Sequence, residues 1–277
     1  MWTQFLKWCR QKLFDRPYRP GSQIGPYRVE KVLGLGSYGI AYLARRAGER
    51  DKVVLKQVRP SLRNTPKGAE MQAYERKVLE LLSHPQIPRC LDSFAYRNDS
   101  FIVLTYLEGP TLEDILFEEN IQLDEYTAAR YMRKLGEVVA YLHTKGIIHR
   151  DVRIPNVIWK DDLPYLIDFG LARLLGDAPA YTAEDLTGYP LEKQLKREVA
   201  PSSDLYALGH FFLFLLYSSY TAEDDAAERS WEEELTLSPA IRQMIRTLLQ
   251  IDPGYASVND WLADLDAYLY NSSTVQA

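Results

Sequence analysis

The chain is poor in cysteine and has no long hydrophobic run. Its two cysteines, Cys9 and Cys90, have a separation that matches neither a zinc site nor a redox motif. Free thiols of this kind indicate a reducing compartment, so we expect a cytoplasmic protein. The longest apolar run, residues 211–217, is far shorter than the stretch of about 20 residues that crosses a membrane, and it fits a buried core helix instead.

An excess of positive charge is also lacking. The 33 Lys and Arg residues are outnumbered by 38 Asp and Glu residues, which gives a net charge of −5. A mildly acidic chain has no general attraction to nucleic acid, which we therefore exclude as a partner. With 277 residues, 46% of them hydrophobic, the chain is long enough for one large two-lobed domain and too short for two independent domains.

Two short polar segments in the middle of the chain carry most of the information about function. Residues 149–156 read H-R-D-V-R-I-P-N, and residues 168–170 read D-F-G. An acid, a cation and a carboxamide in one loop, followed by a second acid in a turn, suit phosphoryl transfer from a metal-bound nucleotide. The two segments resemble the catalytic loop and the metal-binding turn of the protein kinase superfamily.

A glycine-rich turn lies upstream of these segments. Gly34, Gly36 and Gly39 form the pattern G-x-G-x-x-G, and apolar runs on both sides predict a strand, a turn and a second strand. Glycines let the backbone approach phosphate oxygens closely. A dinucleotide-binding turn would be followed by a helix, whereas residues 42–44 look like more strand, so the context favours the kinase loop.

A lysine and a glutamate follow the glycine turn. Lys56 ends an apolar run, and by resemblance it holds the α- and β-phosphates of ATP. Glu75 begins an apolar helical repeat that stops at His84, and the glutamate of the corresponding family helix pairs with the lysine; Glu70 is a fallback. The alternative for Lys56 is a strand end with its head in solvent.

The resemblance also assigns roles within the catalytic loop. Asp151 is the base for the substrate hydroxyl, and Asn156 and Asp168 are ligands of Mg²⁺, or of Mn²⁺ in its place. Arg153 stands where Ser/Thr kinases carry lysine and keeps a positive charge near the γ-phosphate. Tyrosine kinases usually have an arginine at the position of Pro155, so we expect Ser/Thr specificity.

The resemblance implies an adenine pocket as well. Residues 101–107 are similar to the hinge between the lobes, with Leu104 as the gatekeeper. Ala41 and Val54 exchange the residue sizes that are usual in the family, which roughly keeps the pocket volume. The expected ATP-binding residues are Gly34, Leu35, Gly36, Ser37, Tyr38, Gly39, Ala41, Val54, Lys56, Leu104, Thr105, Tyr106, Leu107 and Ile158.

Together these motifs imply an α+β, two-lobed protein kinase-like fold. We expect a kinase domain over residues 27–270, with a small antiparallel β lobe that carries one helix (27–106), a larger helical lobe (107–270) and a tail (271–277). The form of the catalytic loop is typical of a bacterial member. The implied activity is ATP-dependent phosphorylation of Ser/Thr hydroxyls on a protein substrate. A nucleotide-binding pseudokinase or scaffold and a small-molecule kinase of the same fold remain alternatives, and the sequence specifies neither the substrate nor the oligomeric state.

The segment after residue 170 departs from the family pattern. Its candidate phosphoacceptors are Tyr181, Thr182 and Thr187, and Arg150 pairs either with such a phosphate or with a carboxylate. Glu192 is the nearest match to the usual Ala-Pro-Glu glutamate. The arginine that should pair with it is missing after Pro253, so we expect no buried ion pair there. The histidines at 84, 143 and 210 are assigned no chemistry.

Residues 1–26 precede the kinase-like region. Apolar residues of the segment 1–16 fall on one helical face and basic residues largely elsewhere, which predicts a basic amphipathic helix. Such a helix packs on the small lobe or a partner protein, or lies on an anionic membrane, and both alternatives stay open. Pro17, Pro20 and nearby glycines indicate a linker.

Overall fold

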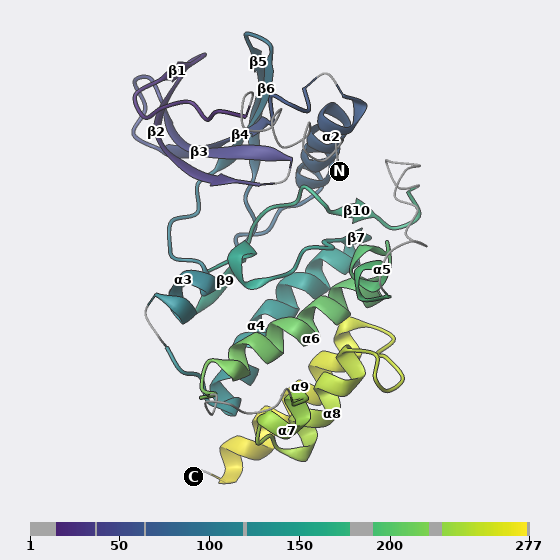
Figure 1. The fold of residues 1–277 in the computed structure, drawn as a ribbon. Helices are drawn as coiled ribbons and strands as arrows, with labels where there is room; N and C mark the ends of the chain where they lie inside the picture. Colours follow the sequence, from purple (N-terminus) through teal and green to yellow (C-terminus); the bar gives the residue numbers. More distant parts are fainter. Residues whose placement is uncertain are drawn as a thin grey trace. The chain divides into compact units, whose positions relative to one another are not determined.

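The computed structural model describes residues 15–275, apart from residues 37, 64, 119–120, 178–190 and 222–228. The chain divides into two compact units, Met1–Leu107 and Glu108–Ala277, which we call the first and the second unit. In Figure 1 the first unit runs from purple to blue and the second from teal to yellow. None of the described helices is long and apolar enough to cross a membrane.

The first unit is built on an antiparallel sheet of six strands in the order β1-β2-β3-β4-β6-β5. Neighbouring strands in this order are mostly consecutive in the chain, as in a series of hairpins. The strands are β1 (Gln23–Ile24), β2 (Tyr27–Leu35), β3 (Gly39–Arg46), β4 (Lys52–Val58), β5 (Cys90–Tyr96) and β6 (Asp99–Thr105).

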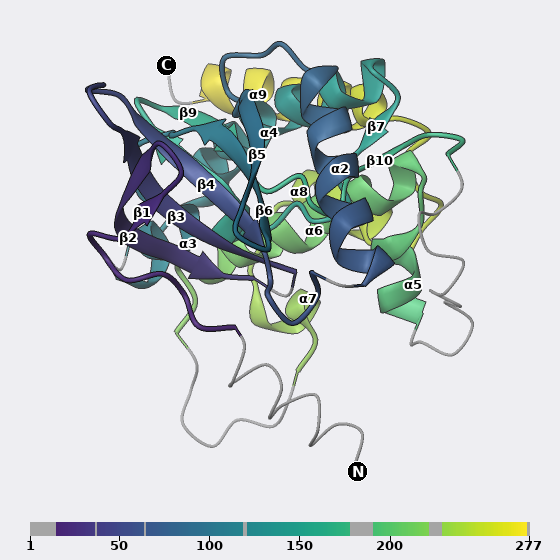
Figure 2. The same cartoon turned by 90° about the horizontal axis from the view of Figure 1, so that it is seen from above.

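The two faces of this sheet have different tasks, because successive side chains of a strand point to opposite faces. One face forms the core of the unit, where Phe94 stacks between Tyr27 and Phe101 at ring distances of 5.5 and 5.3 Å. The other face carries Lys56, Val54 and their neighbours, and helix α2 (Pro66–Glu80) packs against it (Figure 2).

Local chemistry fixes α2 at its start and along its length. Thr65 caps the helix by accepting a hydrogen bond from the backbone N–H of Gly68. A Cβ on Gly68 would lie 2.5 Å from the carbonyl oxygen of Leu62, so only glycine fits there. One turn before Glu75, the side-chain amide of Gln72 donates to the carbonyl oxygens of Lys56 (3.0 Å) and Ser100 (3.3 Å). These bonds tie the helix to β4 and β6.

The described part of the predicted linker belongs to the sheet. Strand β1 pairs with β2, and the backbone N–H of Gly21 donates to the carbonyl oxygen of Val29. Proline and glycine suggested a free connection, but Tyr18 packs edge-on against Tyr42 at 6.1 Å and covers the core face. The predicted helix over residues 1–16 lies almost entirely outside the described residues and stays a prediction.

The second unit is mainly helical. Its helices are α3 (Leu112–Phe117), α4 (Glu125–Thr144), α5 (Leu191–Arg197), α6 (Pro201–Tyr217), α7 (Trp231–Glu234), α8 (Pro239–Leu248) and α9 (Val258–Val275). Two short antiparallel strand pairs, β7 (Ile147–Ile148) with β10 (Arg173–Leu174) and β8 (Val157–Lys160) with β9 (Leu163–Leu166), lie near the 3₁₀ turn η1 (Ile154–Asn156).

Helix α6 forms the centre of this unit and contains the apolar run 211–217 that the sequence predicts as core. It packs against α4, which packs in turn against α9 (Figure 1). The close approach of α4 and α9 requires glycine at 136, because a Cβ there would lie 2.7 Å from the rings and methyls of Trp261 and Leu262.

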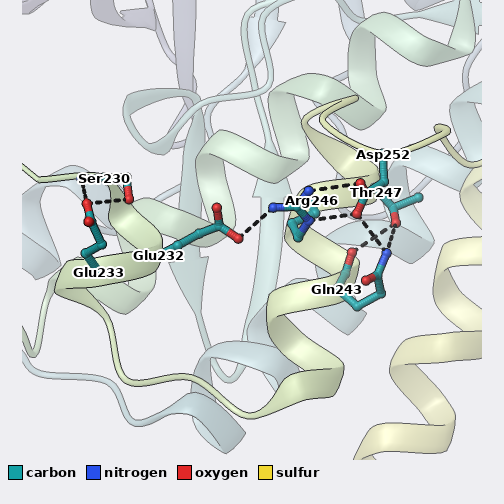
Figure 3. A network of polar contacts seen from close by, with 7 residues as sticks. All are labelled: Ser230, Glu232, Glu233, Gln243, Arg246, Thr247 and Asp252. Carbon is teal, nitrogen blue, oxygen red and sulfur yellow. Dashed lines mark hydrogen bonds and ion pairs between the residues drawn. The ribbon is translucent and has the colours of Figure 1, made fainter.

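Arg246 on α8 joins three elements at the far end of the chain. It contacts Glu232 of α7 at 2.8 Å and Asp252 of the following loop at 2.7 Å (Figure 3). Glu192 is exposed and pairs instead with Lys196 on its own helix at 2.5 Å. The expected absence of a buried ion pair at Glu192 therefore agrees with the structure.

Candidate active site

The catalytic loop follows β7 and is held from below by one buried carboxylate. Asp204 of α6 is fully buried and accepts hydrogen bonds from the backbone N–H groups of His149 (2.9 Å) and Arg150 (2.7 Å). The Nε2 atom of His143 lies 2.9 Å from the same carboxylate. Burial on its own would raise the pKa of Asp204, but the bonds from His143 and His149 outweigh it and lower the pKa.

Asp151 lies at the centre of the loop, one residue after these anchors. The side-chain amide of Asn156 donates to its Oδ2 at 2.8 Å and to its backbone carbonyl at 2.9 Å. The Nε atom of Arg153 lies 3.3 Å from its Oδ1. Burial raises the pKa of Asp151, and the carboxylate of Asp168 acts in the same direction, while the positive charge of Arg153 opposes them.

His149 supports the loop from inside the second unit. Its ring is fully buried, accepts a hydrogen bond from the backbone N–H of Asp151 at 3.3 Å, and meets the ring of Phe169 edge-on at 4.7 Å. Burial lowers the pKa of His149 below the ordinary value of 6.5. A buried neutral ring suits the bracing task that the sequence suggested for this residue.

The metal-binding turn is tied to the catalytic loop. The backbone N–H of Ile167 donates to the carbonyl oxygen of Asn156 at 2.9 Å. The next residue, Asp168, is exposed, has φ of +62° and accepts a hydrogen bond from the backbone N–H of Gly170. Phe169 is buried and anchors the turn. A left-handed aspartate is costly, and such strain is concentrated at functional sites.

In the first unit, Lys56 and Glu75 form the ion pair that the sequence predicts. The Nζ atom lies 2.6 Å from Oε1 of Glu75, and the side chains are 19% and 4% exposed. The fallback residue Glu70 is exposed on the same helix. The lysine head is therefore fixed in the protein and does not extend into solvent as the alternative interpretation requires.

The glycine turn joins β2 and β3, with the backbone N–H of Gly36 bound to the carbonyl oxygen of Gly39 at 2.9 Å. A Cβ on Gly39 would lie 2.9 Å from the carbonyl oxygen of Gln57, so packing excludes a side chain there. A Cβ on Gly34 or Gly36 would meet nothing closer than 3.6 Å in the described chain. Packing does not require glycine at these two positions, whereas a ligand that approaches the backbone does. Ser37 lies outside the described residues.

The residues expected around adenine occupy consistent positions within each unit. Val54 pairs with Leu104 across β4 and β6, and Ala41 shares their face of the sheet. The N–H of Thr105 donates to the carbonyl oxygen of Arg89 at 3.0 Å, so the expectation that it is offered to adenine is wrong for this donor. The backbone of Tyr106 and Leu107 remains the candidate.

In the second unit, Ile158 lies on β8 next to Gly109. A Cβ on Gly109 would lie 2.8 Å from Cγ2 of Ile158, so the chain passes closely over this side chain. The guanidinium of Arg150 donates to the carbonyl oxygens of Leu171 and Arg197. These contacts are to backbone and not to a carboxylate or a phosphate. The candidate phosphoacceptors at 181, 182 and 187 lie outside the described residues.

Three supporting residues were missed by sequence reasoning. His143 was assigned no chemistry, although it contacts Asp204, and Gln72 and Arg59 were not considered. The Ser-Asp pair at the start of the core helix was the available signal for Asp204. Neither Gln72 nor Arg59 belongs to a motif, so only the packed structure reveals their partners.

The comparisons with known proteins decide the family. The model of the protein kinase domain matches residues 27–257. The chain is 34% identical over 262 residues to the probable serine/threonine-protein kinase YbdM of Bacillus subtilis (strain 168), which covers 94% of this chain and 96% of YbdM. This chain belongs to the protein kinase family.

Other relatives agree with this assignment. Serine/threonine-protein kinase PknA of Nostoc sp. is 30% identical over 82% of this kinase and 44% of its own length, and kinase D of Synechocystis sp. is 26% identical over 82% and 48%. This kinase thus spans less than half the length of these two proteins. The crystal structure of the PknI kinase domain of Mycobacterium tuberculosis has a TM-score of 0.66 at 19% identity, and the match covers 91% of this kinase and 99% of that chain. The predicted kinase fold and the prediction of a bacterial-type Ser/Thr protein kinase are confirmed.

Proposed function

We propose that this kinase transfers the γ-phosphoryl group of ATP to serine and threonine hydroxyls of protein substrates through the residues described above. Serine/threonine-protein kinases among its relatives support the specificity, and so does Pro155 in the catalytic loop. The observation that carries the proposal is the catalytic loop itself. A carboxylate, an amide and a guanidinium are held together there, directly after the backbone that Asp204 anchors.

We assign the role of general base to Asp151. Asn156 and Arg153 hold its two carboxylate oxygens, so the group is oriented before a substrate hydroxyl arrives. Burial raises the pKa of Asp151, which makes its carboxylate a better proton acceptor than an ordinary aspartate at any pH above that pKa.

Asn156 and Asp168 would hold the divalent metal ion that the family uses with ATP. We propose Mg²⁺, with Mn²⁺ able to replace it, because both residues offer hard oxygen atoms. The amide nitrogen of Asn156 is bound to Asp151, which leaves its Oδ1 as the ligand atom. The bound ion would neutralise charge on the phosphates.

Lys56 and the glycine turn would bind the phosphates of ATP. Glu75 holds the lysine head in place, which lowers the entropy cost of each contact with phosphate. The space at Gly34 and Gly36 admits phosphate oxygens close to the backbone, where N–H groups can donate to them. The fit supports ATP as the phosphoryl donor.

Transfer of labelled γ-phosphate to basic protein substrates, in Mg²⁺ or Mn²⁺ and followed by phosphoamino-acid analysis, tests the proposal. We expect label on serine and threonine that requires the metal ion. Asn156→Ala should raise the metal concentration needed for half-maximal rate, whereas Asn271→Ala, on the exposed surface of α9, should not. Label on tyrosine would contradict the specificity, and ATP binding without transfer would indicate a pseudokinase.

A further inference from the structure

The first described residue, Asp15, is buried although it precedes the region that matches the kinase domain. The match begins at residue 27, and the side chain of Asp15 is 3% exposed. Its carboxylate accepts hydrogen bonds from the backbone N–H of Ser61 (2.8 Å), the hydroxyl of Ser61 (2.8 Å) and Nη1 of Arg59 (3.0 Å). An acid of this kind is buried only with partners, and here it has three.

Arg59 connects this carboxylate to the glycine turn. Its Nε donates to the carbonyl oxygen of Gly36 at 2.6 Å, while Nη1 of the same guanidinium binds Asp15. Its backbone N–H donates to the carbonyl oxygen of Tyr38 at 2.9 Å. The turn is therefore held at two carbonyl groups by a single residue, whose planar side chain binds in two directions at once.

The segment that carries Asp15 is itself fixed on the sheet. The hydroxyl of Tyr18 donates to Asp99 at 3.2 Å, and its backbone N–H donates to the hydroxyl of Tyr42 at the same distance. Strand β1 follows a few residues later and pairs with β2. Asp15 thus acts on Arg59 from a position set by hydrogen bonds further along the chain.

We infer that Asp15 and Arg59 are positioning residues that hold the glycine turn in its ATP-binding shape. Glycine-rich backbone has more conformations to lose than any other when it binds a ligand. A guanidinium bound to Gly36 and Tyr38 removes part of that cost in advance, and the carboxylate of Asp15 fixes the guanidinium. The inference rests on the proposed function, because it takes the glycine turn as the phosphate-binding element.

The two residues act as one unit, and this sets the expected pattern of effects. Without the carboxylate, the guanidinium of Arg59 loses the charged partner that orients it, and the bond to Gly36 weakens. Asp15→Asn should raise the KM for ATP about tenfold, the loss expected for a charged hydrogen bond, with kcat within about twofold. Arg59→Lys should have a similar effect, and the double variant should be no worse than either single variant.

The experiment measures kcat, the KM for ATP and amide hydrogen exchange over residues 34–39 in the full chain. Asp15→Asn, Arg59→Lys and the double variant are compared with Glu49→Gln, which breaks an exposed ion pair with Arg46 in the same unit. We expect a higher KM and faster exchange in the turn for the first three proteins and neither change for the control. A thermal midpoint for each variant separates these effects from general unfolding.

Two results would overturn the inference. One is an Asp15→Asn protein with the KM and turn exchange of the wild type; the other is additive losses with an equal fall in kcat and thermal midpoint, which would indicate a merely structural bond. A wild-type protein that binds ATP but transfers no phosphate would refute the proposed function alone. The nucleotide Kd and turn exchange of the same variants would then still decide the role of Asp15.

Discussion

The carboxylate of Asp204 accepts a 2.7 Å hydrogen bond from the backbone N–H of Arg150, a residue with φ of +65°. A non-glycine residue in this conformation costs free energy and persists only where its surroundings hold it. The catalytic base is the next residue in the chain. The position of Asp151 therefore depends on a carboxylate that itself lies inside the helical core.

Replacement of Asp204 by alanine should disable catalysis and weaken the fold together. Two backbone N–H groups and His143 would lose their buried acceptor, which we expect to cost about 3–5 kcal/mol of unfolding free energy. Asp204→Asn keeps an acceptor oxygen and should cost less. Urea unfolding and kcat measure both effects, and an alanine variant with wild-type stability would contradict this role.

The charge of Arg153 should set the pH at which the kinase loses activity in acid. Arg153 lowers the pKa of Asp151, against the larger effect of burial, so Arg153→Ala should raise that pKa further. Since only the ionised carboxylate accepts a proton, the acid limb of the kcat/KM profile should move to higher pH. Arg153→Lys keeps the charge and should move it much less. An unshifted limb in Arg153→Ala would argue against Asp151 as the titrating base.

Stability should decrease as the pH falls below about 6.5, the ordinary pKa of histidine. Burial lowers the pKa of His149, His84 and His210, so each is neutral in the folded protein and takes up a proton more readily once unfolded. His149→Phe keeps a ring against Phe169 but removes one of these groups. Unfolding free energies across this range should show a shallower slope for the variant, and an unchanged slope would assign the effect elsewhere.

Gln72 should control how well α2 presents Glu75 to Lys56. Gln72→Leu removes the donors to the carbonyl oxygens of Lys56 and Ser100, so the helix can move away from β4. We expect kcat/KM to fall about tenfold, which corresponds to one or two lost hydrogen bonds. Glu70→Gln on the exposed side of the same helix is the control and should leave the rate unchanged. Equal rates in both variants would show that the helix needs no such anchor.

The residues that sequence reasoning placed well belong to short motifs. Lys56 and Glu75 were predicted as a pair because a strand end and a helical repeat fix where each lies. The neighbours Asp151 and Asn156 were predicted because they share one loop. The functions of these residues follow from the motifs, whereas the distances between them come only from the structure.

The supporting contacts could not be predicted because they join distant parts of the chain. The bond between Asp204 and Arg150 depends on how α6 packs beneath the loop, and no local pattern encodes that. Asp15 was assigned to a linker because prolines and glycines follow it, yet it is buried against Ser61. Thr105 was assigned to adenine by its place in the hinge, while its N–H is already bound to Arg89.

The most direct test of the account compares phosphate transfer by the wild type, Asp151→Asn and Asp161→Asn. Asp161 lies in the exposed turn between β8 and β9 with φ of +51°, a conformation that asparagine also adopts, so it is a matched control. We predict label on serine and threonine for the wild type and Asp161→Asn, and at least about a hundredfold slower transfer by Asp151→Asn with ATP still bound. Equal transfer by Asp151→Asn would contradict the account.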